Sequence, residues 1–265
     1  MTIQFNTDNL PLSVLASSPA ETVSSRYRFI STYDIVQELN QHGWYVKHAS
    51  ETPTRKEIYI GKQAHSLELM HRDFLPIRDL GDISPMILLR NGHNGKSRLS
   101  INIGIHRKVC ANGLILPESF LSVSCTHTGN VKSLVAAALL QVKSTIPYVL
   151  GCAAKWNNLL VNDNQRMHYL TRIKNEGLLR DGLDLNLLDR PNRSYDQGNT
   201  LWLMYNRIQE NLIKGQLPYV TTNNRSMHTR EIRSISRKYD TNQKLWELTQ
   251  ITGYRIENGL DREVL

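Results

Sequence analysis

The spacing of apolar residues changes once along this chain of 265 residues, and that change constrains the fold more than any other feature. Between residues 57 and 125 apolar and polar residues alternate, as in HSLELMHR (65–72) and RLSINIGIHR (98–107), which is typical of strands with one buried face. After Thr128 apolar residues recur every three or four positions, which predicts helices, the first of them ending before Pro147. These helices are predicted at about 130–145, 149–161, 163–175, 199–214 and 241–252. The sequence therefore predicts an α+β fold, with a central antiparallel sheet of four to six strands packed with helices and a largely helical C-terminal half.

Turn and cap residues set the expected boundaries of these elements. A short amphipathic helix is predicted to begin at Ser31 or Thr32 and to stop at Gly43. Residues 91–95 (NGHNG) contain two Asn-Gly pairs, which accept the positive φ angles of a hairpin turn. A second chain reversal is predicted at 111–113.

The chain divides into three regions, and no linker separates them. Residues 1–25 carry two prolines and five serines with weak periodicity, so we expect a flexible N-terminal arm or a loosely docked segment. Residues 26–128 are predicted to hold the helix and the antiparallel sheet. Residues 129–265 form a helical region that we expect to pack on the sheet as one domain.

Cysteine usage and apolar runs bear on the cellular compartment. Three cysteines, an odd and small number, do not suggest the disulfide framework of a secreted domain. The N-terminus lacks the features of a secretory signal, and the longest apolar run, 134–140, is far shorter than the roughly 20 residues that cross a bilayer. We therefore expect a protein of the cytoplasm, of its own cell or of a host, without a membrane partner.

The segment GHNGKS at 92–97 ends like a phosphate-binding P-loop, but its spacing does not match. A P-loop has a glycine five residues before its Gly-Lys pair, where this chain has Arg90. A helix must also follow, whereas residues 98–107 predict a strand. A glycine-rich hairpin tip is the favoured interpretation.

Catalytic and metal-binding motifs are weak in this sequence. His106, Cys110, Cys125 and His127 are possible zinc ligands, yet their spacing does not match paired zinc motifs, and buried free cysteine is the commoner case. Acidic residues are scattered singly, and motifs for nucleophilic catalysis are missing. We therefore predict no metal, no cofactor and no catalytic residue, with a Mg²⁺-dependent nuclease of dispersed carboxylates as a minor alternative.

Positive charge is concentrated in two segments. The chain has a net charge of +8 and a pI near 9.4. Residues 83–117 contain no acid, and residues 214–244 contain seven basic and two acidic residues, so the two segments together carry +10. Such concentration is the expected footprint of phosphate binding, although most charge runs are simply solvated surfaces. The candidate nucleic-acid-binding residues are Arg90, Lys96, Arg98, Arg107, Lys108, Arg225, Arg230, Arg233, Arg237 and Lys238.

Arginine spacing and nearby aromatic residues favour polynucleotides among the polyanions. If residues 230–237 are helical, Arg230, Arg233 and Arg237 lie along one face, and guanidinium groups suit phosphates. Arg107 can either hold a phosphate or brace the fold through buried hydrogen bonds. Aromatic residues that could stack on bases are Tyr27, Trp44, Tyr195, Tyr219 and Tyr239, although Trp44, which follows Gly43, fits the core at least as well.

Four segments of the chain resemble a phage/plasmid-like family of unknown function found in prophages and conjugative plasmids. They are VSSRYRFISTYDIVQELNQHGW (23–44), PMILLRNGHNGKSRLSINIGIHRKVCANGLIL (85–116), LWLMYNRIQENLIKG (201–215) and MHTREIRSISRKYDTNQKLWELT (227–249). The marks of the resemblance are Ser-Arg-Tyr at 25–27, the loop at 91–95, the strand turn at 107–114 and Gln-Glu-Asn-Leu at 209–212. The resemblance supplies no catalytic residues. It implies carriage on mobile elements and work on nucleic acid or against host defences.

These observations predict a non-enzymatic single-stranded DNA-binding protein of a phage or plasmid, and specifically a strand-annealing recombination factor that forms homo-oligomers. The two basic segments are expected to form the walls of a groove for the phosphate backbone, with exposed aromatic residues stacking on bases. The alternative is an anti-defence protein that binds and inhibits a host nuclease or restriction complex.

Overall fold

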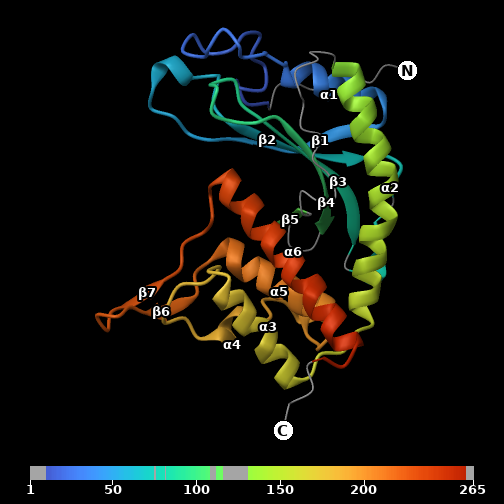
Figure 1. Ribbon diagram of the computed structural model, residues 1–265, viewed down its shortest axis with the longest axis vertical. Coiled ribbons are helices and arrows are strands. Elements are labelled where there is room, and N and C mark those ends of the chain that lie inside the picture. Colours follow the sequence, from blue (N-terminus) through green and yellow to red (C-terminus); the bar gives the residue numbers. More distant parts are fainter. Residues whose placement is uncertain (1–9, 75, 81, 108–111, 116–130, 261–265) are drawn as a thin grey trace. The chain divides into compact units, whose positions relative to one another are not determined.

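The computed structural model describes residues 10–74, 76–80, 82–107, 112–115 and 131–260 (Figure 1). These residues form an α+β fold with two antiparallel sheets and a mainly helical C-terminal half, which confirms the predicted fold class. The chain consists of two compact units, Met1–Pro147 and Tyr148–Leu265, called unit 1 and unit 2 below.

Unit 1 is built on an antiparallel sheet with the strand order β1-β2-β3-β4-β5. The strands are β1 (Trp44–Glu51), β2 (His65–His71), β3 (Ile83–Asn91), β4 (Ser100–Arg107) and β5 (Asn112–Ile115). The alternating segments 65–72 and 98–107 therefore form β2 and β4 as predicted, whereas β1 was not predicted. Leu67, Leu89 and Ile101 are paired neighbours across β2, β3 and β4, and each is at most 2% exposed.

The centre of this sheet is buried on both faces. All seven residues from Ile83 to Leu89 in β3 are buried, and so is Asn102 in β4. The prediction of a half-buried strand at 98–107 is therefore wrong for β4. Such continuous burial is typical of a strand that has packing partners above and below the sheet.

The chain turns between β3 and β4 as the two Asn-Gly pairs predicted. At the start of the turn, the side-chain oxygen of Asn91 accepts a hydrogen bond of 2.8 Å from the Gly92 nitrogen. Strand β4 follows the loop, so GHNGKS occupies a hairpin and lacks the helix of a P-loop. Strands β4 and β5 are antiparallel and pair from Arg107 and Asn112, so Asn112 and Gly113 of the predicted reversal belong to β5, while residue 111 lies outside the described residues.

Helix α1 (Thr32–Gln41) begins and ends where the sequence predicted. The Ser31 hydroxyl accepts a hydrogen bond of 3.2 Å from the Asp34 nitrogen, which satisfies one of the free N–H groups of the first turn. Ile35, Val36 and Leu39 are fully buried on one face. A buried apolar stripe of this kind is what holds so short a helix on a sheet.

Residues 10–25 contact the rest of unit 1 at several points. The Ala20 nitrogen donates a hydrogen bond of 2.8 Å to the His93 oxygen, and the Ser13 hydroxyl donates one of 2.7 Å to a Glu51 carboxylate oxygen. Val14 is fully buried. These contacts secure the described part of the expected arm to the β3–β4 loop and to β1.

Helix α2 (Val131–Asn157) contains Pro147, so the prediction that it ends before this proline is wrong. Proline removes one intrahelical hydrogen bond and costs about 3 kcal/mol inside a helix. Buried side chains on both sides of the proline, including Val142, Ile146, Val149 and Ala153, keep the helix packed across this position. Burial of the apolar face thus outweighs the local preference.

Among the described residues, α2 is long and apolar enough by length and composition to cross a bilayer. In its most apolar window of 18 residues 39% are buried, and buried core helices of similar length meet the same criterion. It is therefore weak evidence for a membrane span.

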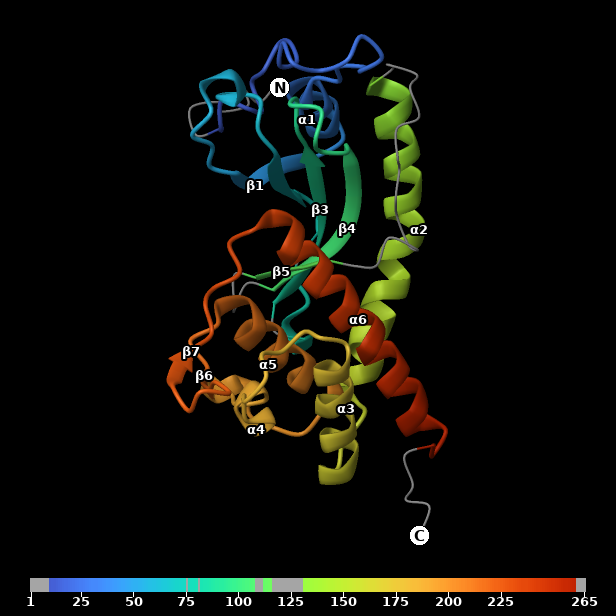
Figure 2. The same ribbon diagram turned by 60° about the vertical axis from the view of Figure 1, so that its left-hand side comes forward.

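Unit 2 is mainly helical (Figure 2). Its further elements are α3 (Asp163–Asn175), α4 (Leu185–Leu188), α5 (Leu201–Lys214), β6 (Pro218–Val220), β7 (Ser226–His228) and α6 (Ile235–Glu257). A short 3₁₀ turn occurs in unit 2 at Ser194–Asp196, and unit 1 has two such turns, at Glu57–Tyr59 and Arg78–Leu80. Helices α3 and α5 were predicted almost residue for residue, α6 is longer than predicted, and the β6–β7 hairpin was not predicted.

An aromatic cluster forms the core of unit 2. Trp156 and Trp246 have ring centroids 4.6 Å apart, and Tyr205 stacks on Trp202 at 5.8 Å. All four side chains are at most 4% exposed. Trp202 and Trp246 are thus core residues, and the cluster joins the end of α2 to α5 and α6.

Candidate nucleic-acid interface

The predicted basic residues of unit 1 differ widely in exposure. Lys96 and Arg98 are exposed in the β3–β4 loop, and the Lys96 ammonium lies 4.9 Å from the centre of the Tyr59 ring. Arg90 is half-buried on β3. Arg107 is 2% exposed, so it does not belong to the exposed basic surface. Lys108 lies outside the described residues.

The predicted basic residues of unit 2 are more accessible. Arg225 is exposed in the turn between β6 and β7, and Arg233 and Arg237 are exposed near the start of α6. Helix α6 begins only at Ile235, so Arg230 and Arg233 precede the helix. The prediction that Arg230, Arg233 and Arg237 lie on one helical face is therefore wrong. Lys238 follows in the first turn of α6 and is half-buried.

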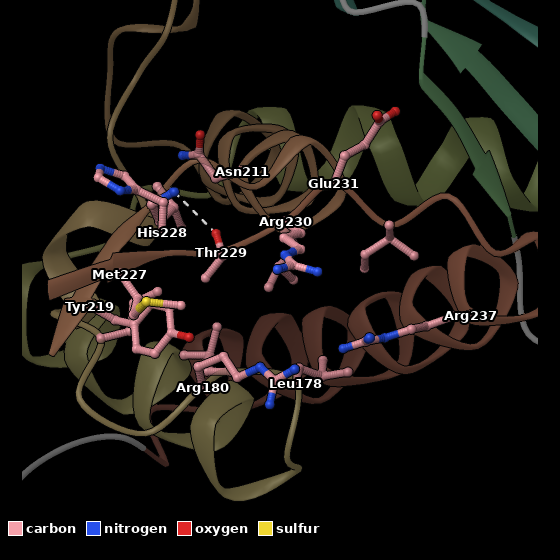
Figure 3. Close-up of a pocket in the computed structure, with 15 residues that line it drawn as sticks. Leu178, Arg180, Asn211, Tyr219, Met227, His228, Thr229, Arg230, Glu231 and Arg237 are labelled. Carbon is pink, nitrogen blue, oxygen red and sulfur yellow. Dashed lines mark hydrogen bonds between the residues drawn. The ribbon is translucent and has the colours of Figure 1, made fainter. Parts of the chain in front are cut away.

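A pocket of about 510 Å³ in unit 2 brings two of the predicted arginines together with one that the sequence did not indicate (Figure 3). Arg230 and Arg237 line it, together with Arg180 from the loop after α3. Figure 3 shows Arg180 and Arg237 extending toward one another, with Arg230 above them. Arg180 gave no signal in the sequence because it is a single arginine followed directly by Asp181. We call Arg180, Arg230 and Arg237 the arginine cluster.

The guanidinium groups of the arginine cluster have no ion pair or hydrogen bond to other side chains within the part of the chain that the structure describes. Glu231 is the acid in the lining, and its carboxylate lies 3.3 Å from Nε of Arg233, outside the cluster. Three like charges around one cavity repel each other, and an anion in the cavity relieves that repulsion. The cluster is therefore suited to an anionic ligand.

Two glycines allow the walls of the pocket to approach closely. Gly182 has a φ of +79°, and a Cβ atom there would meet the Val220 carbonyl oxygen at 1.9 Å. Gly215, which ends α5 with a φ of +69°, lies against the backbone of Arg230 in the same way. These two positions thus hold β6 and the Arg230 backbone beside the helices.

The rest of the lining is largely apolar. Tyr219 and Met227 extend from facing positions of the β6–β7 hairpin, and Figure 3 shows them side by side next to Arg180. Leucines of the α3–α4 loop and of α5 complete the wall. The pocket therefore has a cationic part and an aromatic and apolar part, which is the pattern of sites for organic anions.

A buried ionic network lies behind the pocket, on α5 and the loop before it. Both carboxylate oxygens of Glu210 accept hydrogen bonds from Arg193, at 2.6 and 2.7 Å. The neighbouring Asn211 donates hydrogen bonds of 2.8 and 3.0 Å to the carbonyls of Leu188 and Arg190. These residues, part of Gln-Glu-Asn-Leu at 209–212, hold the loop between α4 and α5 in place.

The candidate metal and stacking residues are placed as follows. His106 is half-buried on β4, while Cys110, Cys125 and His127 lie outside the described residues. Within the described residues no group of three His, Cys, Asp or Glu side chains is placed to hold a metal ion. Trp44 and Tyr239 are core residues, 2% and 3% exposed, so neither can stack on a base.

Tyr195, by contrast, is 53% exposed. Tyr27 donates a hydrogen bond of 3.0 Å to the Gly92 oxygen and is half-buried. Tyr219 therefore remains as the stacking candidate that lies next to arginines.

Comparisons with known proteins identify the family. The family described as "Domain of unknown function (DUF932)" matches residues 19–246. The UPF0380 protein YafZ of Escherichia coli (strain K12) is 30% identical over 244 residues, which cover 90% of this chain and 86% of YafZ. The UPF0380 protein YfjQ of the same strain is 30% identical over 240 residues, with the same coverage of both chains. No solved structure matches the chain. The chain belongs to the DUF932 family.

Proposed function

We propose that this protein binds single-stranded DNA without cleaving it, through arginines of unit 2 that contact backbone phosphates. The observation that carries the proposal is the gathering of three guanidinium groups, which have no side-chain partner among the described residues, beside a hairpin whose turn holds a further exposed arginine, Arg225. Guanidinium groups bind phosphates bidentately, and each phosphate contact releases condensed counterions.

A single strand fits this surface better than a duplex. Tyr219 presents part of an aromatic ring next to the arginine cluster, and bases are free to stack on aromatic rings only when they are unpaired. Lys96 and Arg98 on the β3–β4 loop of unit 1 offer a second, smaller basic surface. Each surface is proposed to contact phosphates in its own right.

The biological setting that we propose is a phage or plasmid whose product works in the cytoplasm of the host. A strand-annealing factor needs several protomers along one strand, so the proposal includes a homo-oligomer on DNA. The basic net charge of +8 supports binding to a polyanion.

The test measures binding to a circular single strand and to a duplex over a salt series. We expect the logarithm of the affinity to fall with the logarithm of the salt concentration, with a slope of about −0.7 per phosphate contacted on the single strand. The double variant Arg225→Glu, Arg233→Glu should bind at least about tenfold more weakly, because both residues are exposed and basic.

Lys143→Glu is the matched control, since Lys143 is an exposed residue of α2 outside both basic surfaces. No binding of either DNA at low salt would overturn the proposal and leave inhibition of a host nuclease as the function to test. Strand cleavage on addition of Mg²⁺ would overturn its non-enzymatic part.

A further inference from the structure

The arginine cluster lies in a pocket, and a pocket holds the end of a strand more readily than a continuous backbone. Its lining comes from four segments: the loop after α3, the end of α5, the β6–β7 hairpin and the segment that leads into α6. A volume of about 510 Å³ is in the range of sites for one small organic ligand. From this geometry, and resting on the proposed function, we propose that the pocket binds the terminal phosphate monoester of a nucleic-acid strand.

The charge of the pocket matches a phosphate monoester better than an internal phosphodiester. Because its second pKa is near 6, a phosphate monoester carries about 1.5 to 2 negative charges at pH 7. It also has three free acceptor oxygens. An internal phosphodiester carries a single charge. The arginine cluster supplies three positive charges. Its guanidinium groups can donate hydrogen bonds to the oxygens of one monoester from three sides.

The apolar part of the pocket lies where the attached nucleoside would follow. Tyr219 and Met227 lie side by side next to Arg180 in Figure 3, so a phosphate held at the cluster leaves its sugar and base against these two side chains. Stacking of a base on an aromatic ring contributes about 1–3 kcal/mol without regard to sequence. The phosphate thus gives end selectivity, and the tyrosine gives affinity for any base.

The arrangement is specific to the fold. Arg180 and Arg230 are 50 positions apart in the sequence, and the close approach of Gly182 to Val220 brings their segments together. The Leu183 and Tyr219 backbones also form a β-bridge at this place. An exposed charge run on one helix would need neither contact.

The experiment compares single strands of one sequence that carry a 5′-phosphate, a 3′-phosphate or hydroxyl groups at both ends, with a circular strand as a fourth ligand. We expect one phosphorylated end to bind at least about tenfold more tightly than the hydroxyl strand, as one or two charge-assisted hydrogen bonds would give. The two phosphorylated strands distinguish a 5′ end from a 3′ end.

Two variants separate the pocket from the general surface. Arg180→Gln should abolish the preference for the phosphorylated end, so that phosphorylated and hydroxyl strands bind alike, because Arg180 lies in the pocket. Arg225→Gln, outside the pocket lining, should weaken all four ligands alike and keep the preference. Both residues are exposed, so the folded state should persist, and a thermal melt checks it.

Equal binding of phosphorylated and hydroxyl strands, together with clear binding of the circular strand, would overturn the end-binding site and leave the proposed function standing. Binding of phosphorylated ends without binding of the circular strand would support the site and overturn the proposed function. Absence of binding to all four ligands would overturn both.

Discussion

The two units bury polar side chains in opposite ways. The buried cluster of unit 1 is uncharged and consists of Thr32, His65, Asn91 and His93. The buried network of unit 2 is ionic and joins Asp189 and Glu210 to arginines. Both include marks of the family resemblance, at 91–95 and at 209–212, and in both the marked residues hold loops in place. The motifs at 91–95 and 209–212 therefore serve the fold, and the arginine cluster lies outside both of them.

The unit 1 cluster is a chain of hydrogen bonds with a defined direction. Asn91 donates from its side-chain amide to the Thr32 hydroxyl at 2.9 Å, which leaves that hydroxyl free to donate to Nε2 of His65 at 2.8 Å. Nδ1 of His65 donates in turn to the Gln63 oxygen at 3.1 Å. The two hydrogen bonds of His65 together require a neutral imidazole with its proton on Nδ1. Protonation of His65 would break the middle link.

The unit 2 network depends on charge at every step. Asp189 accepts one hydrogen bond of 2.8 Å from Nε of Arg166 and one of 2.7 Å from Nε of Arg207. Arg207 also donates to the backbone oxygens of Asp196 and Gly198, both at 2.8 Å. Its side chain is only 6% exposed, so Asp189 is the counter-charge that keeps a buried guanidinium in place.

The largest effect is expected when this counter-charge is removed. Asp189→Ala leaves Arg207 buried without its carboxylate, which costs about 3–5 kcal/mol of unfolding free energy. Urea unfolding followed by tryptophan fluorescence reports on this unit, since three of the four tryptophans belong to it. Asp189→Asn is the matched control of equal size. A loss below about 1 kcal/mol for Asp189→Ala would show that the network is not the stabilising feature of unit 2.

Acid should destabilise unit 1 through its histidines. Burial lowers the pKa of His65 to about 4, against the opposing effects of its hydrogen bond to the Gln63 backbone and of Glu51. Burial together with His65 and Lys62 lowers the pKa of His93 to about 4. Because these pKa values lie below the ordinary 6.5, the unfolded chain binds more protons between pH 6.5 and 4. Stability is complete above pH 6.5 and falls as the pH approaches 4, by about 3 kcal/mol per histidine.

Amide hydrogen exchange at about pH 7 and about pH 4.5, corrected for intrinsic rates, measures this loss separately for each unit. Protection should fall in the peptides of unit 1 that carry α1, β2 and the β3–β4 loop. The variant His65→Gln, which cannot become charged, should show a smaller loss. An unchanged pH dependence in His65→Gln would contradict the assignment to this residue.

Loss of the central hydroxyl should have an intermediate effect. Thr32→Val keeps the shape of the side chain but leaves Nε2 of His65 without its donor, which costs about 1–3 kcal/mol for a buried group. Asn91 keeps its second bond, to the Ile30 oxygen at 3.1 Å. Thr32→Ser retains the hydroxyl and should recover most of the stability in urea unfolding. If Thr32→Val is as stable as the unmodified protein, the hydrogen bond to His65 does not stabilise the cluster.

Predictability differed between elements for physical reasons. The alternation in 65–72 and 98–107 identified β2 and β4 because successive side chains of a strand point to opposite faces of the sheet, although β4 is buried on both faces. Strand β1 escaped because its burial does not alternate, and the β6–β7 hairpin escaped because each strand has only three residues. Pro147 misled the prediction for α2, since tertiary burial on both sides of it outweighs a local signal.

The candidate site was predicted in part. The charge distribution indicated Arg230 and Arg237 because both lie in a basic segment. Arg180 could not be found, since only the approach of the hairpin to the α3–α4 loop brings it to them. The same charge argument included Arg107 among the candidates and left open whether it binds phosphate or is buried, and its position on β4 buries it. Charge patterns locate basic segments, and tertiary packing decides which side chains reach solvent.

The smallest effect is expected at the edge of the ionic network, where the comparison between buried and exposed charge can be made within one site. Lys214 pairs with the same Glu210 carboxylate as Arg193, but the Lys214 side chain is 49% exposed and the Arg193 side chain 21%. Lys214→Met should therefore cost less than about 1 kcal/mol, because exposed pairs are screened by water and Arg193 still holds the carboxylate with two hydrogen bonds. Arg193→Met should cost several times more in the same urea titration, since the lysine alone cannot satisfy both oxygens of a carboxylate that is 3% exposed. Equal losses of unfolding free energy in the two variants would mean that burial does not set the strength of these two ion pairs.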